Sequence, residues 1–186
     1  MDLQNITLIS FGYFEEDFLK KIAGAVNHEF FFSVNIKEGH IDLSEFYDPV
    51  RRQYNGNKLL KEVDSLYATD LNKTIGLFNV DLFIPILTYI FGQAFLNGRT
   101  GIASLYRFSN ERYGMNSDDK FILDRFKKEV IHELGHAFGL IHCHVPTCVM
   151  RSATYVEDID QKSENLCFRC RNEVNSILHS GTTKAN

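Results

Sequence analysis

The chain has 186 residues, of which 44% are hydrophobic and 24% charged, and its formal net charge is −4. These values are ordinary for one globular domain, and they provide no general electrostatic attraction to nucleic acid or to anionic membranes. The longest apolar stretch, DLFIPILTYIFGQAFL, is interrupted by Pro85, Gly92 and Gln93. It falls short of the roughly 20 apolar residues that a membrane span needs, so we expect no membrane partner.

The first half of the chain alternates between strand and helix patterns. Its opening residues, MDLQNITLISFGYF, lack the features of a signal peptide, so we expect a cytoplasmic protein, and we expect a monomer. Branched and aromatic residues predict strands over 6–14, 31–36 and 74–84. Apolar residues at helical spacing predict helices over 15–30 and 57–67. This order of elements indicates an α/β layer.

A hairpin is predicted next, because the strand-like runs YIFGQAFL and TGIASLYRF are separated by NGR. An Asn-Gly pair between two such runs is a strong hairpin signal. The strand over 101–106 should therefore lie late in the sheet. It is either an ordinary core strand or an edge strand that can hold an extended peptide by main-chain pairing.

A long helix is predicted over 118–138, with residues 116–119 (NSDD) supplying a cap and negative charge for its first turn. Its apolar stripe consists of Leu123, Phe126, Val130, Leu134 and Ala137. At about 100° per residue, His132 and His136 lie on the opposite side, roughly 40° apart. A helix with a core stripe on one side and two imidazoles on the other suits a position beneath a cleft.

His132, Glu133 and His136 form the pattern H-E-x-x-H, in which two histidines ligate zinc and the glutamate acts as general base. On these five positions alone, an amphipathic helix with two surface histidines is an equal explanation. Gly139 can adopt the left-handed conformation that ends a helix, and the chain can then bring His142 to the same metal. Three neutral nitrogens and one water make an open catalytic zinc site.

The four cysteines form two pairs, Cys143 with Cys148 and Cys167 with Cys170, separated by an 18-residue segment. A reducing compartment disfavours disulfides. The spacing matches a structural zinc site, and four buried free thiols are the alternative. A four-sulfur site has no open position, so it would stabilise the fold without performing chemistry. A last helix, predicted over 166–179, would carry the second pair in its first turn.

The complete pattern between residues 132 and 170 is H-E-x-x-H-x-x-G-x-x-H-C, then C-x-M, then C-x-x-C. It resembles the archaemetzincins, a branch of the metzincin clan of zinc peptidases with a second zinc held by cysteines. The resemblance implies an α/β (α+β) fold, a metzincin-like single domain with a twisted mixed sheet packed on helices. Residues 1–139 would form an N-terminal subdomain with the sheet and the active-site helix. Residues 140–186 would form a small C-terminal subdomain with the structural zinc.

The resemblance also implies a function: a zinc metallopeptidase that cleaves a peptide or small protein substrate. Two zinc ions are expected per chain, and Glu133 would activate a zinc-bound water. Met150 would belong to the clan's methionine-containing turn beneath the metal, which is compatible with a core methionine. Several metzincins have a tyrosine two residues after this methionine, and here that position is Ser152. The nearby Arg151 and Tyr155 cannot be assigned, so the group that stabilises the oxyanion is open.

Two other functions fit the same residues. The first is a latent or non-catalytic peptide-binding module, in which Cys143 or His144 closes the histidine site as a fourth protein ligand. The second is a purely structural scaffold with two zinc ions. For an active enzyme, the residues do not choose between endopeptidase and aminopeptidase activity.

Overall fold

The computed structural model describes residue 3, residues 5–114, residue 116 and residues 118–181. Its larger sheet has the strand order β2-β1-β5-β9-β8. These strands are β1 (Asn5–Phe11), β2 (Ser33–Gly39), β5 (Asn72–Phe78), β8 (Gly92–Ala94) and β9 (Thr100–Ser104). Strands β2, β1, β5 and β9 are parallel, whereas β8 is antiparallel to β9. The predicted mixed sheet in an α/β fold is confirmed.

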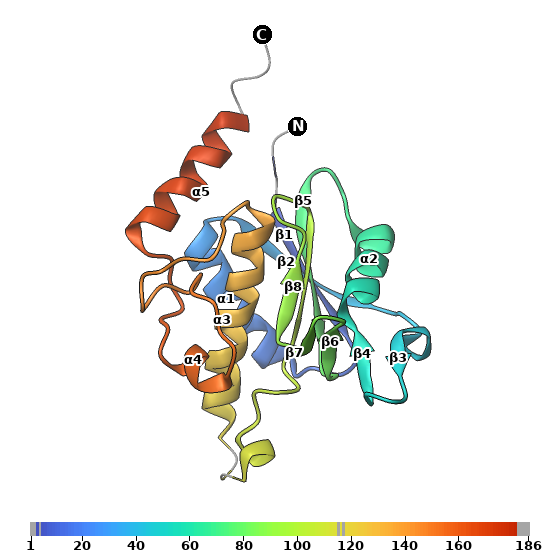
Figure 1. Cartoon of the computed structure of the whole chain (residues 1–186). Helices are drawn as coiled ribbons and strands as arrows, with labels where there is room; N and C mark the ends of the chain where they lie inside the picture. Colours follow the sequence, from blue (N-terminus) through green and yellow to red (C-terminus); the bar gives the residue numbers. More distant parts are fainter. Residues whose placement is uncertain (1–2, 4, 115, 117, 182–186) are drawn as a thin grey trace.

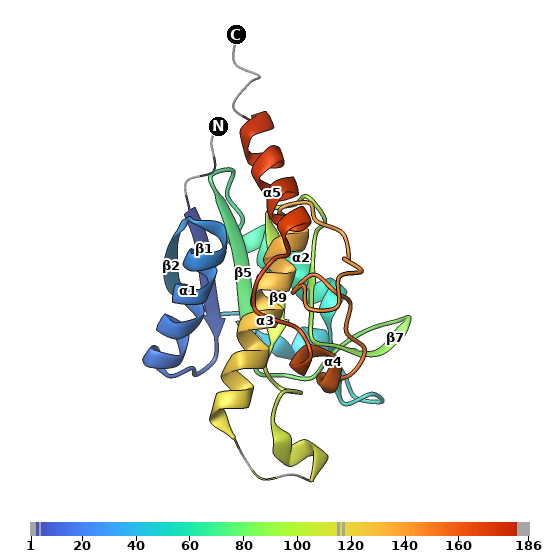
Figure 2. The same cartoon turned by 90° about the vertical axis from the view of Figure 1, so that its left-hand side faces the viewer.

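Helices cover both faces of this sheet (Figures 1 and 2). Helices α1 (Glu16–Phe30) and α3 (Asp119–Ala137) pack on one face, and α2 (Gly56–Tyr67) packs on the other. The central strand β5 is buried on both faces: Ile75 belongs to the core beneath α1 and α3, whereas Phe78 belongs to the core beneath α2. Strands buried on both faces read as continuous apolar runs, which is how residues 74–78 appear in the sequence.

A second, smaller sheet has the order β3-β4-β6-β7. It comprises β3 (Tyr47–Asp48), β4 (Gln53–Asn55), β6 (Leu82–Ile84) and β7 (Leu87–Ile90). The single strand predicted over 74–84 is therefore wrong, because residues 79–81 leave the first sheet. There the Ser104 hydroxyl accepts a hydrogen bond from Val80 N and donates one to Val80 O, while Asp81 binds the Arg107 guanidinium through both carboxylate oxygens.

The predicted hairpin is present, but its second strand is not at an edge. Strand β9 pairs with β5 on one side and with β8 on the other, so both of its edges are occupied. The edge strand is β8, whose three residues pair only with β9 among the described residues. An extended peptide can therefore join this sheet at β8 and not at residues 101–106.

The segment after α3 folds back over α1 and α3 (Figure 2). It contains α4 (Val156–Asp160) and α5 (Phe168–Gly181), the helix predicted over 166–179. The buried carboxylate of Glu29, on α1, accepts hydrogen bonds at 2.7 Å from Leu166 N and from the Arg171 guanidinium. This ties the start of α5 to the helical layer.

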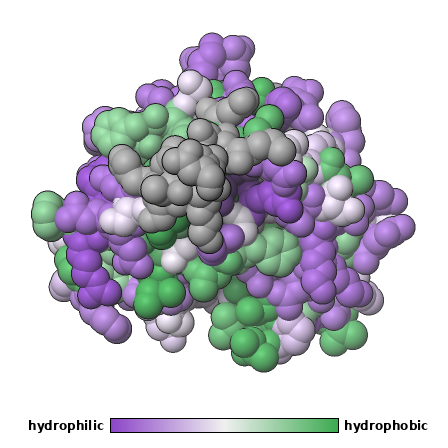
Figure 3. All heavy atoms as spheres, turned by 90° about the horizontal axis from the view of Figure 1, so that it is seen from above, coloured by the Kyte–Doolittle hydropathy of each residue, from purple (hydrophilic) through white to green (hydrophobic). Residues whose placement is uncertain are grey.

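The surface is mixed in character. Seen from above, hydrophilic side chains are interspersed with smaller hydrophobic groups (Figure 3). Over the described part of the chain, no helix combines the length and apolar character that crossing a bilayer requires.

Candidate active site

Helix α3 begins and ends with clear capping interactions. The Asp118 carboxylate accepts hydrogen bonds from Lys120 N and Phe121 N at the start of the helix. At the other end Gly139 has a φ of +100°, and the hydrogen bonds Gly139 N to His136 O and Leu140 N to Gly135 O form a Schellman motif. This left-handed residue turns the chain back toward the helix, as the sequence predicted.

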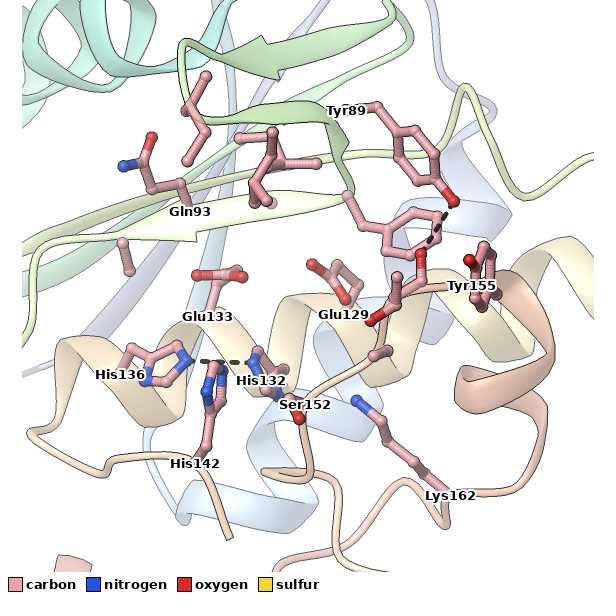
Figure 4. Close-up of a pocket in the computed structure, with 18 of the residues that line it drawn as sticks. Tyr89, Gln93, Glu129, His132, Glu133, His136, His142, Ser152, Tyr155 and Lys162 are labelled. Carbon is pink, nitrogen blue, oxygen red and sulfur yellow. Dashed lines mark hydrogen bonds between the residues drawn. The ribbon is translucent and has the colours of Figure 1, made fainter.

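The turn brings three imidazoles together. His132 and His136 project from α3, and His142 approaches from the following loop (Figure 4). The Nε2 atoms of His132 and His136 are 3.1 Å apart, and the three side chains present nitrogens that lie within 4.8 Å of one another. The predicted group of three histidines is thus assembled around one point.

Main-chain carbonyls orient two of these rings. Nδ1 of His132 donates to Val149 O at 2.8 Å, and Nδ1 of His136 donates to Leu140 O at 2.7 Å. With Nδ1 protonated, Nε2 carries the lone pair that faces the other rings. Burial lowers the pKa of His132 well below its usual value, and burial also lowers the pKa values of His136 and His142. Three neutral imidazoles, two of them oriented by a carbonyl at the second ring nitrogen, fit a zinc ion.

Two carboxyl groups lie beside the imidazoles, between α3 and β8 (Figure 4). Glu133 is 4% exposed, and its Oε2 atom is buried without a hydrogen-bond partner. Burial raises the pKa of Glu133 well above its usual value, and the neighbouring charge of Glu129 raises it further. Strand β8 can approach these groups closely because it has Gly92 here: a Cβ atom would lie 2.8 Å from Glu133 Cγ and 2.9 Å from Glu129 Oε1.

Met150 packs against the same helix from beneath. It is fully buried, and a Cβ atom on Gly135 would lie only 2.3 Å from its sulfur. Gly135 stands between the two helical histidines in sequence, so the missing side chain lets the methionine approach the helix at the level of the site. The predicted position of Met150 beneath the histidines agrees with this contact.

The histidines and carboxyl groups line a cleft of about 630 Å³. Ile84 and residues 87–94 form one wall, and Ile141, Ser152, Ala153, Thr154 and Tyr155 contribute to the other. Tyr155 is 63% exposed, and the Arg151 guanidinium donates to Pro146 O at 3.4 Å. Ser152 also faces the cleft, so the position that carries a tyrosine in several metzincins has only a hydroxymethyl group here.

The four cysteines form a second cluster, in which all the sulfur atoms lie within 4.8 Å of one another. Cys143 Sγ is 3.8 Å from Cys167 Sγ, and Cys148 Sγ is 3.9 Å from Cys170 Sγ. The sulfurs also accept backbone hydrogen bonds, from Val145 N to Cys143 and from Cys167 N to Cys148. Such donors favour thiolates, so the cluster fits a closed four-sulfur metal site.

The start of α5 modulates the acidity of these thiols. Burial opposes ionisation of Cys167, but hydrogen bonds from the Cys170 backbone and from neighbouring thiols outweigh it and lower the pKa to about 7. Burial raises the pKa values of Cys148 and Cys170. Cys170 lies in the first turn of α5, as the sequence predicted, whereas Cys167 directly precedes the helix, which begins two residues later than predicted.

The residues of the cleft that were not identified from the sequence include Glu129, Lys162 and Tyr89. Glu129 could have been found, because it precedes Glu133 by four residues and so shares its helical face. Lys162 and Tyr89 have no such signal. Lys162 follows α4 and reaches the cleft from the loop side, and burial lowers its pKa.

Comparison with known proteins identifies relatives over nearly the whole chain. The model of Peptidase family M54 matches residues 16–176. An archaemetzincin of Thermococcus kodakarensis is 34% identical over 178 residues, which cover 91% of this chain and 94% of the relative. The solved archaemetzincin of Methanopyrus kandleri superposes with a TM-score of 0.83 at 28% identity, covering 95% of this chain and 96% of that one. A zinc-dependent peptidase of Methanocorpusculum labreanum gives a TM-score of 0.81 at 28% identity, with coverages of 92% and 100%.

Proposed function

We propose that this chain, which belongs to peptidase family M54 and is therefore a zinc metallopeptidase, hydrolyses peptide bonds with a water molecule that Glu133 activates. One observation carries the proposal. Three imidazoles converge within 4.8 Å, and the unpaired carboxylate oxygen of Glu133 lies in the same cleft. This is the residue set of a metzincin-type site, with a base next to an open metal position.

His132, His136 and His142 would hold the catalytic zinc, and the four cysteines would hold a structural one. A zinc ion with three nitrogen ligands makes a coordinated water more acidic and polarises a carbonyl group. Glu133 would take the proton of the attacking water and deliver it to the leaving amine. Its buried carboxyl group, with the pKa raised by burial and by Glu129, suits a base that works near neutral pH.

The free edge of β8 would hold the substrate. A three-residue edge strand that lines the cleft can pair with an extended peptide through main-chain hydrogen bonds. Gly92 lies directly above the carboxyl groups, so a peptide along β8 would pass within reach of Glu133. This supports a peptide or small protein as the substrate.

The rival function is a latent module whose histidine site is closed by a fourth protein ligand. The position of Cys143 argues against it, because its sulfur lies in the four-cysteine cluster, 3.8 Å from Cys167 Sγ. His144 is exposed, and the histidine group found among the described residues does not include it. Both observations support an open site.

The test is hydrolysis of a mixed peptide library by the zinc-loaded protein, followed by mass spectrometry. Glu133→Gln should retain two zinc ions per chain and lose activity by about 10²–10⁴-fold, the usual contribution of a general base. The matched control is Glu173→Gln, the same substitution at an exposed glutamate of α5, which should retain full activity. Full activity in Glu133→Gln would remove this residue from the mechanism. If the wild type binds two zinc ions but cleaves no peptide, the latent module is favoured.

A further inference from the structure

One end of the cleft is closed by contacts between its two walls. The Tyr89 hydroxyl, on β7, donates to Thr154 O at 2.8 Å (Figure 4). The segment around Thr154 is itself held by α4, because the Asp158 carboxylate accepts hydrogen bonds at 2.9 Å from Thr154 N and Tyr155 N. A substrate group that enters this end would therefore terminate there, since the continuing chain would have to break the Tyr89 bond.

A buried ammonium group also lines this cleft, on the side of the histidine group. Lys162 is 5% exposed, lines the cleft, and points inward from the loop that follows α4 (Figure 4). Its one hydrogen bond among the described residues is to Val149 O, at a long 3.5 Å. None of the ion pairs within 4.0 Å in the described part of the chain includes it. An ammonium has three donors, and burying it without an anionic partner is costly.

A second buried lysine shows how unusual this is. Lys128 is also 5% exposed, and it too donates to a main-chain carbonyl, Ile159 O of α4, at 3.2 Å. Its charge is balanced by Asp124 at 2.6 Å, within the same helix. Lys162 thus differs from Lys128 in two respects: it faces the cleft, and it has no paired carboxylate within 4.0 Å.

The acidic residues of the cleft do not occupy these donors. Glu129 and Glu133 lie on the β8 side of the cleft; their charges attract the Lys162 ammonium, but neither carboxyl group forms an ion pair with it within 4.0 Å. Lys162 comes from the opposite side of the cleft (Figure 4), whose lining also includes apolar residues such as Ala153. A carboxylate entering between these walls would meet the unused donors in a partly desolvated place, where charge-assisted hydrogen bonds are strong.

We propose that Lys162 binds a carboxylate of the substrate in the cleft, beside the histidine group, so that the enzyme selects peptides with an acidic group next to the scissile bond. This inference rests on the proposed peptidase function. The carboxylate has two sources, an Asp or Glu side chain and a free C-terminus, and both present the same chemistry to an ammonium.

The experiment measures binding on a background that does not hydrolyse peptide. Fluorescent peptides are titrated against zinc-loaded Glu133→Gln and followed by anisotropy. The peptides are alanine-based hexamers in four forms, with Glu or Gln at one position and with a free or amidated C-terminus, and the position is moved along the chain. The same titrations are made with Lys162→Met and, as matched control, with Lys128→Met, both on the Glu133→Gln background.

Carboxylate-bearing peptides should bind Glu133→Gln more tightly than their amide counterparts. Lys162→Met should remove this preference: the affinity for the carboxylate-bearing peptides should fall roughly ten- to hundredfold, and the affinity for the amide peptides should not change. Lys128→Met should retain the preference. Tighter binding of the Glu peptide than of the Gln peptide would identify a side-chain carboxylate as the group that Lys162 binds. Tighter binding of the free C-terminus than of the amidated one would identify the C-terminal carboxylate, and hence cleavage near the end of the peptide.

Three results would overturn the proposal: equal affinity for all four peptide forms, a carboxylate preference that survives in Lys162→Met, or an equal loss of affinity for acidic and amide peptides in that variant. Unchanged affinity for the amide peptides, together with the zinc content, shows that Lys162→Met is folded. Because binding is measured without turnover, failure here is separable from failure of the peptidase function, which the library hydrolysis tests.

Discussion

Substitution of Gly135 by alanine tests the packing that supports the histidine site. The added methyl group would lie 2.3 Å from the sulfur of Met150 and 2.9 Å from its terminal carbon. Both distances are far inside ordinary van der Waals contact. Met150 is fully buried, and Leu140 also lies near the new methyl group at 3.5 Å, so the methionine has little room to move aside.

The expected cost follows from two opposing effects. Overpacking a buried contact costs about 1–3 kcal/mol. Replacing a glycine in the interior of a helix by alanine stabilises by roughly 1 kcal/mol. Gly135→Ala alone should therefore lower the free energy of unfolding by up to about 2 kcal/mol. In a Met150→Ala background the collision is absent, and the same substitution should stabilise by roughly 1 kcal/mol.

The assay is a double-mutant cycle by urea denaturation of the zinc-loaded protein. The two substitutions should be coupled by about 1–3 kcal/mol, the overpacking cost alone, because the helix-propensity gain is common to both backgrounds. Zinc content is measured in parallel, since displacement of the helix would move His132 and His136. Additive effects would refute the close contact between Gly135 and Met150, and so would a Gly135→Ala variant more stable than the wild type.

Three further substitutions probe the charges and clusters around the site. Burial depresses the pKa of His132 below its usual value of about 6.5, so the metal-free fold disfavours protonation of this ring. The free energy of unfolding of the metal-free protein should therefore decrease as the pH drops below about 6.5. Urea denaturation at a series of pH values should show a smaller decrease in His132→Asn. Cys170→Ser should lose the cluster metal and also weaken zinc binding at the histidine site, because Cys143 directly follows His142; metal analysis after dialysis should give less than one zinc per chain. Arg125→Met leaves two acceptors, Phe108 O and Asn110 Oδ1, without their donor. The free energy of unfolding, measured by thermal or urea unfolding, should fall by roughly 1–3 kcal/mol for each of them.

The sequence predicted elements whose pattern is local and missed those set by pairing. Helices α1, α2 and α3 show apolar residues at helical spacing, and each forms close to its predicted bounds. The run over 74–84 is apolar apart from Thr74, Asn79 and Asp81, and its break at residues 79–81 is fixed by the contacts of Val80 with Ser104 and of Asp81 with Arg107. Those partners are more than 20 residues away, so periodicity within the run cannot reveal them.

The same distinction explains which strand lies at the edge. Residues 101–106 and their hairpin partner have similar composition, and the Asn-Gly turn shows that they pair without showing which of them also pairs with β5. In the structure Gly101 lies against Ile75 of β5, where a Cβ atom would approach its terminal methyl to 2.7 Å. A glycine that permits close packing was visible in the sequence, but the strand it packs against was not.

The histidine and cysteine groups were predictable because chemistry constrains them at short range. Four-residue spacing on a helix places His132 and His136 together, and a left-handed glycine returns His142, whatever the rest of the fold does. Lys162 has no comparable constraint. It reaches the cleft because α4 is packed on α3 and because Tyr89 fastens the preceding segment to β7, both of which are tertiary contacts. The residues that would hold the metal are thus encoded within one helix and its turn, whereas the residue proposed to select the substrate is positioned by the assembled domain.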